Sequence, residues 1–148
     1  MPVEVLLPGM RRFHFDHFAF LFGQLSLALI FIWFGALKLA GISPVVSVIA
    51  QAMPIIARYP ILYTLLALFE LAVGFALLMP RLTRIAAWLI VGHLIFATGS
   101  VLISPQAFES GFPALSVVGE FVIKNLALVA LALLLIAQKS IWKTESNT

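Results

Sequence analysis

The chain has 148 residues, of which 63% are hydrophobic and 10% are charged, with a formal net charge of +3 and no cysteine. Soluble domains contain about 45–50% apolar and about 25% charged residues, so this chain has too few polar side chains to cover a water-facing surface. The composition excludes a soluble enzyme, a nucleic-acid-binding protein and a disordered chain. The lack of cysteine excludes disulfides, thiolate metal sites and thiol-based redox relays.

Four apolar stretches are long enough to cross a bilayer, which takes about 20 helical residues. Pro60 suits the first position of the second helix, and Pro80 follows its end. In the first outer loop, Ser43 and Pro44 predict a short interfacial helix over 44–53. The sequence therefore predicts an all-α, four-helix membrane bundle that forms one domain over 1–148. Its spans are expected at about 18–40, 60–79, 83–103 and 115–137.

Basic residues are distributed unequally between the two sides of these spans. Six of them lie before the first span, in the turn between the second and third spans, or after the fourth, whereas the opposite loops contain only Arg58. Because loops rich in Lys and Arg stay on the cytoplasmic side, both termini are expected to be cytoplasmic in a bacterial inner membrane. The six residues are Arg11, Arg12, Arg81, Arg84, Lys139 and Lys143.

Five ionisable residues fall inside the predicted spans: Lys38, Glu70, His93, Glu120 and Lys124. A charge at the bilayer centre costs about 2.5–3.5 kcal/mol on insertion scales, so these side chains are expected to face the bundle interior and pair with one another. Glu70 and His93 lie near the middle of their spans, and Glu120 precedes Lys124 by one turn on the same face. Together they predict a polar pocket that opens outward beneath the apolar first loop.

Each of these residues has a structural interpretation beside a functional one. Glu70 either forms a packing ion pair with Lys38 or Lys124, or it is a proton-carrying or ligand-binding carboxylate. The same choice applies to Lys124, which has Glu120 as a helical partner. Lys38 lies near the outer end of its span and is expected to extend its amine toward the headgroups. His93 is expected to bond a neighbouring carbonyl or hydroxyl.

Small residues indicate which helix faces meet. Ala67 and Gly74 share a stripe with Glu70 on the second span, and Ala97 shares one with His93 on the third. Helices in membranes approach closely at such stripes, so the carboxylate and the imidazole are expected at helix contacts rather than against lipid.

The histidines do not predict a metal or haem site. Haem would require a second histidine at the depth of His93, but His14 and His17 precede the first span. His14 and His17 can share one helix face. Their Arg- and Phe-rich surroundings nevertheless predict an amphipathic entry into the membrane.

Three stretches contain family-like motifs. The first reads F-x-W-x-G-x-x-K over 31–38 and continues to Pro44, the second joins Glu70 and Gly74 to Pro80, and the third runs from Leu102 through G-F-P at 111–113 to Lys124. The chain resembles the DoxX-like superfamily of small four-span bacterial membrane proteins, and most closely its YkgB-type reactive-chlorine-resistance branch.

The resemblance implies a role in redox or oxidative (reactive chlorine) stress defence. Some members of the superfamily are membrane subunits of quinone-linked sulfur-oxidising enzymes, which makes quinone an expected ligand. Lys38, Glu70 and Lys124 match the family pattern. Departures from it are Gln24 and Glu120, where basic residues are usual, and Asn125, where an acidic residue is usual.

Three functions fit these features. The first is a redox-associated membrane protein that binds quinone or another small molecule near Glu70, His93 and Lys124, with Glu70 or His93 moving protons. No intrinsic redox centre or catalytic constellation is recognisable, so electrons would come from a membrane partner protein, and independent catalysis is not expected. The second is a structural or assembly subunit of a larger respiratory or redox complex. The third is a permease component, which would need to form a homo-oligomer.

Overall fold

The computed structural model describes the backbone of residues 7–108 and 114–145, and the side chains of 16–56, 58–105, 107–108, 114–120 and 122–137. Most of this chain is helical, and four helices are long and apolar enough to cross a membrane. These candidate spans are Asp16–Leu39, Pro60–Leu77, Thr83–Leu102 and Val117–Ala137. The predicted all-α, multi-pass bundle is confirmed.

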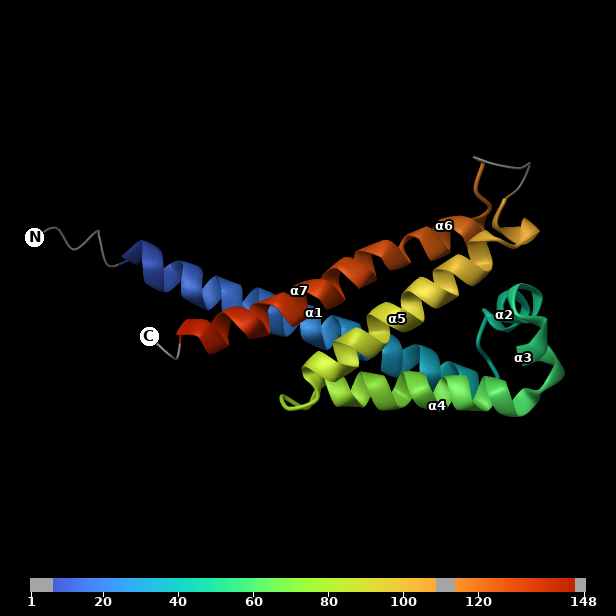
Figure 1. Cartoon of the computed structure of the whole chain (residues 1–148), viewed down its shortest axis with the longest axis horizontal. Helices are drawn as coiled ribbons and strands as arrows, with labels where there is room; N and C mark the ends of the chain where they lie inside the picture. Colours follow the sequence, from blue (N-terminus) through green and yellow to red (C-terminus); the bar gives the residue numbers. More distant parts are fainter. Residues whose placement is uncertain (1–6, 109–113, 146–148) are drawn as a thin grey trace, which may run out of the picture.

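The first helix, α1 (Leu7–Leu39), has 33 residues and begins well before the predicted span. The amphipathic entry around His17 and the first span are therefore one continuous helix. At about 1.5 Å per residue this helix is about 50 Å long, whereas the hydrocarbon core is about 30 Å thick. Its N-terminal part consequently extends beyond the other helices (Figure 1).

Gly41 ends α1 in a Schellman motif. Its φ of +72° is in the left-handed region that favours glycine. Its N–H donates to the Lys38 carbonyl at 3.1 Å, and the N–H of Ile42 donates to the Leu37 carbonyl at 3.2 Å. The chain thereby leaves α1 sharply and turns back over the end of the bundle.

The first outer loop forms two short helices, α2 (Val46–Ala52) and α3 (Pro54–Arg58), where one was predicted. Pro54 separates them because proline has no N–H to continue a helix and restricts the backbone of the residue before it. Ser43 was expected to be the cap, but its carbonyl accepts a bond from the Val46 N–H within a turn.

The remaining elements are α4 (Pro60–Leu77), α5 (Thr83–Leu102), a 3₁₀ turn η2 (Pro105–Ala107), α6 (Val117–Ile123) and α7 (Asn125–Glu145). The fourth span is thus divided at Lys124, whose carbonyl accepts a 3₁₀-type bond from the Ala127 N–H at 3.0 Å. Gly119 lies so close to η2 that a Cβ added there would clash with the Ala107 carbonyl oxygen. Only glycine allows this contact.

The helices α4, α5 and α6–α7 follow one another antiparallel, and α1 lies against α4 (Figure 1). The helices α2 and α3 lie at the end opposite both termini. One buried apolar cluster, which contains Leu27, Leu77 and Ile90, holds the four spans together. A second, around Val101 and Val122, joins α5 and α6 to the loop helices.

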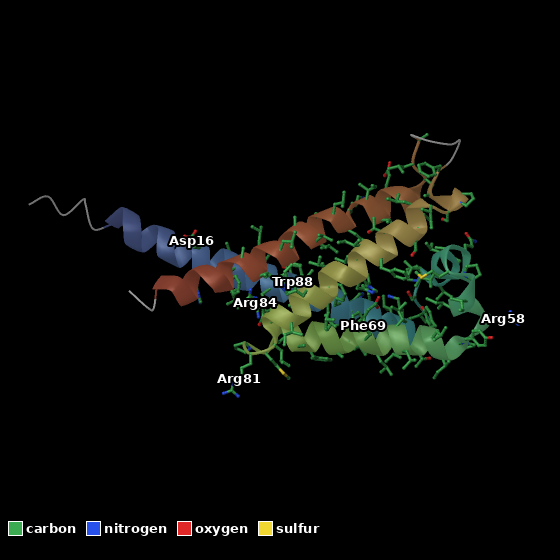
Figure 2. The ribbon with its side chains drawn as sticks, viewed as in Figure 1. Asp16, Arg58, Phe69, Arg81, Arg84 and Trp88 are labelled. Atoms are coloured by element: carbon green, nitrogen blue, oxygen red, sulfur yellow. The ribbon has the colours of Figure 1, made fainter. Side chains whose placement is uncertain are left out.

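The basic segments gather at one end of the molecule. Arg81 and Arg84 mark the α4–α5 turn at the end that carries both termini, whereas Arg58 lies at the opposite end beside α3 (Figure 2). The predicted charge asymmetry therefore coincides with the long axis of the bundle.

Candidate functional site

Two glycines bring α1 and α4 into close contact. A Cβ added at Gly35 would lie 2.9 Å from the Ala67 carbonyl oxygen, and one added at Gly74 would lie 2.9 Å from the Ile32 backbone nitrogen. Such contacts let the helix backbones approach closely. As a result, the last turn of α1 lies beside the middle of α4.

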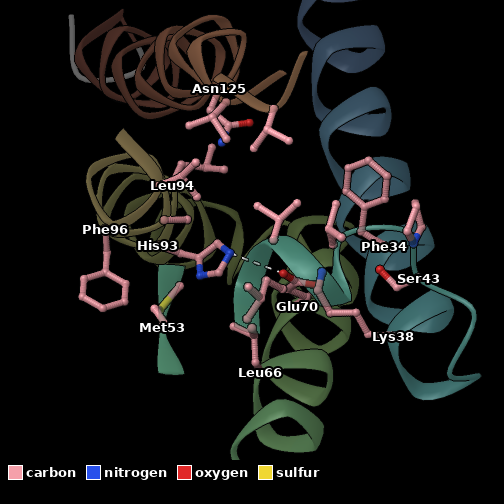
Figure 3. A pocket seen from close by; sticks show the side chains of 18 of the residues that line it. Phe34, Lys38, Ser43, Met53, Leu66, Glu70, His93, Leu94, Phe96 and Asn125 are labelled. Atoms are coloured by element: carbon pink, nitrogen blue, oxygen red, sulfur yellow. Dashed lines mark hydrogen bonds and ion pairs between the residues drawn. The ribbon is translucent and has the colours of Figure 1, made fainter. Parts of the chain in front are cut away.

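This contact places Lys38 against Glu70. The Lys38 Nζ lies 2.5 Å from Glu70 Oε2, and the two side chains are only 4% and 7% exposed. The second carboxylate oxygen, Oε1, lies 3.4 Å from Nε2 of His93 on α5 (Figure 3). Three helices therefore converge on one carboxylate, and we refer to Lys38, Glu70 and His93 as the triad.

The expectation that Lys38 extends toward the headgroups is wrong, and helix direction explains why. Side chains of an α-helix lean toward its N-terminus. Lys38 lies near the C-terminal end of α1, so its side chain leans back into the bundle. Its donors then meet the Glu70 carboxylate in the buried contact between α1 and α4.

Aromatic rings surround the triad. The ring centroids of Phe31 and Phe69 lie 5.9 and 5.5 Å from that of His93. The Lys38 Nζ lies 5.9 Å from the centroid of Phe34, within the range of cation–π attraction. These rings make the surroundings of the triad largely apolar, and charge interactions are stronger in an apolar environment than in water.

The triad lines a cavity of about 430 Å³ at the level between the two apolar clusters. Ser43 and Asn125 are the other polar residues in its lining, and the rest of the lining is mainly apolar. Residues of the first outer loop, including Val48, Met53 and Ile56, cover it from the α2–α3 end. A cavity does lie beneath the apolar first loop, but it is mainly apolar and contains only three of the five ionisable residues that were expected to line it (Figure 3).

The cavity also reaches the outside of the bundle. Phe96 of α5 and Val117 of α6 line it and are 64% and 79% exposed. Part of the cavity lining is therefore exposed on the outside of the single chain.

Glu120 and Lys124 do not join this site. Both are exposed, and neither pairs with Glu70, so the expectation that all five ionisable residues face inward is wrong for these two. Val118, Val122 and Asn125 face the cavity from α6 and the start of α7. At about 3.6 residues per turn, Glu120 and Lys124 fall on the opposite side of that helix.

Two amides inside the spans link neighbouring helices instead. Gln24 is buried on α1, and its Nε2 donates to the Leu77 carbonyl and, at 3.3 Å, to Thr83 Oγ1 across the α4–α5 turn. Asn125 Nδ2 donates to Thr98 Oγ1 at 3.3 Å, which joins α7 to α5. In the sequence, the signal for these contacts is the presence of an amide side chain inside a predicted span.

Among the residues with described side chains, no three His, Asp or Glu residues gather as a metal-binding group. The side chain of His14 lies outside the described residues. No family model, curated protein or solved structure matches the chain. The structural support for a function therefore comes from the geometry of the triad and its cavity.

Proposed function

We propose that this chain is a DoxX-like protein of the bacterial cytoplasmic membrane that acts in redox or reactive-chlorine stress defence. In this proposal both termini are cytoplasmic, and the cavity binds quinone or a similar small carbonyl compound beside the triad. The support comes from the motifs, from the gathering of basic residues at one end, and above all from one buried carboxylate shared between a lysine and a histidine.

The cavity suits a small, mostly apolar ligand. Ligand pockets commonly measure about 300–1,000 Å³ and combine apolar walls with a few converging polar groups, and this cavity of about 430 Å³ has that character. Its aromatic walls can hold a planar ring, while Lys38 and His93 supply hydrogen-bond donors. The exposed lining at Phe96 and Val117 offers a route from the lipid.

The triad can bind and exchange a proton. Lys38 Nζ can donate to a ligand oxygen without leaving Glu70, because an ammonium carries three donors. Glu70 can hold a proton received through His93, whose side chain is 14% exposed and is the most accessible of the three. A bound quinone would supply carbonyl oxygens and the capacity to accept electrons from a partner protein.

The alternative is a structural or assembly subunit of a larger membrane complex. It is supported by the same ion pair, because a buried lysine and carboxylate can simply hold α1 against α4. The two functions differ in what happens when both charges are replaced together.

The test is titration of the purified protein in mild detergent with a short-chain ubiquinone, followed by calorimetry. The decisive variant is Lys38→Met/Glu70→Leu, which removes both charges of the buried ion pair, so that neither is left without its counter-charge, while His93 loses its Glu70 contact. We expect its affinity to fall at least about tenfold, since a hydrogen bond from a charged donor such as Lys38 contributes about 1.5–3 kcal/mol and about 1.4 kcal/mol corresponds to tenfold in affinity. Asp16→Asn, an exposed carboxylate outside the cavity, is the matched control and should bind like wild type.

Wild-type affinity in the double variant would contradict the binding proposal and favour the structural one. A strain that lacks the protein provides the functional readout. Survival of hypochlorous acid should be restored by Asp16→Asn but not by the double variant. Equal survival with both variants would contradict a role of the triad in stress defence.

A further inference from the structure

Glu120 and Lys124 lie inside the fourth candidate span with exposed side chains. Lipid is a poor environment for such groups, because a charged side chain in the hydrocarbon region carries a free-energy penalty and normally faces a partner or a polar cavity. The cavity is on the other side of the helix, at Val118 and Val122. Among the side chains that the structure describes, none pairs with either charge.

Glu120 begins a longer exposed stripe, and Lys124 lies at its edge. The residues that share this face recur alternately three and four positions apart, which keeps them on one side of a helix. Three of them are alanines, and small residues are enriched where membrane helices approach one another. The exposed members are Glu120, Ile123, Ala127, Ala130, Leu134 and Ala137. We refer to these six residues as the α6–α7 stripe.

The charges are complementary to those of a second copy. In a two-fold symmetric contact each residue i meets residue j of the partner, and j meets i. If the two-fold axis runs along the membrane normal between facing stripes, Glu120 of each copy can reach Lys124 of the other. The offset along the helix is about 6 Å, which two long side chains can span. One contact thus forms two ion pairs and leaves no charge toward lipid.

We propose that the α6–α7 stripe is a homodimer interface in which Glu120 and Lys124 form reciprocal ion pairs between two copies. The alanines allow the two α7 helices to pack closely below the charges. This contact lies on the side of α6–α7 away from the cavity, so ligand binding and dimerisation are separable.

The test uses charge reversal with differently tagged copies, measured by co-capture in mild detergent and by FRET in membranes. Glu120→Lys alone would place two lysines opposite two lysines, and Lys124→Glu alone would place acids opposite acids. Each should weaken self-association about tenfold or more, because like charges at an interface are strongly unfavourable. Co-expression of the two variants restores opposite charges at both contacts, so the mixed pair should associate like wild type.

The mixed pair distinguishes an ion pair between two chains from an ion pair within one helix. An intrahelical Glu120–Lys124 pair that is lost on charge reversal would not be restored by co-expression of a second chain. Should the charge variants fail to accumulate, the apolar pair Ala130→Phe and Leu29→Phe decides. Ala130 lies in the α6–α7 stripe, whereas Leu29 is exposed on α1. Only Ala130→Phe should abolish association. A monomeric wild type in membranes, or association that survives Ala130→Phe, would overturn the proposal.

Discussion

At the scale of single residues, the site depends on the balance of charge around Glu70. One carboxylate accepts from Lys38 through one oxygen and faces His93 with the other. Removing the carboxylate leaves a buried ammonium without a counter-charge, which is far more unfavourable than replacing the whole pair by apolar groups.

We therefore expect Glu70→Gln and Lys38→Met each to lower the free energy of unfolding by about 3–5 kcal/mol. The double change Lys38→Met/Glu70→Leu should restore a stability close to that of wild type. Thermal unfolding in detergent, followed by circular dichroism, measures both effects. Additive destabilisation in the double variant would show that the two side chains do not interact.

At the scale of elements, the contact between α1 and α4 controls the site, because it determines which α1 residue faces Glu70. Gly35 and Gly74 meet neighbouring backbone atoms, whereas a Cβ at Gly92 on α5 would meet nothing within 4 Å. Gly35 and Gly74 are therefore close-packed, whereas Gly92 is open, and Gly92 serves as the control position for the other two.

Gly35→Ala and Gly74→Ala should each destabilise the protein by about 1–3 kcal/mol, because the added methyl group forces the helices apart. Gly35→Ala should also weaken ligand binding by displacing Lys38. Gly92→Ala should be neutral or stabilise by about 0.5–1 kcal/mol, since alanine favours a helix. The same thermal assay tests this order, and equal destabilisation at all three positions would contradict the packing explanation.

At the scale of the whole molecule, the long axis of the bundle separates a basic end from the end covered by α2 and α3. A chain that lacks cysteine allows single labelling sites to be placed at each end. Arg58 and Arg81 are both exposed and lie at opposite ends.

A membrane-impermeant maleimide added to intact spheroplasts should label Arg58→Cys, whereas Arg81→Cys should react only after the membrane is opened. The physical reason is the retention of basic segments on the cytoplasmic side. Labelling of Arg81→Cys alone in intact spheroplasts would reverse the proposed orientation and place the cavity mouth at the cytoplasmic half.

The spans and the presence of an inward-facing polar site could be predicted from the sequence. The second and third spans, α4 and α5, begin at the predicted residues, Pro60 and Thr83, because apolar length and prolines act locally. Glu70 and His93 could be placed in the interior because an unpaired charge in lipid is unfavourable.

The partner of Glu70 was decided by the tertiary structure alone. Small residues indicate which faces of the helices are in contact but not which neighbour each face meets. The sequence therefore left both Lys38 and Lys124 as candidate partners of Glu70, and it favoured a headgroup position for the Lys38 amine. The close approach of α1 and α4 at Gly35 and Gly74, and the lean of Lys38 toward the N-terminus of its helix, select Lys38. Lys124 is left on the outer face because the opposite face of α6 packs toward the cavity and α5.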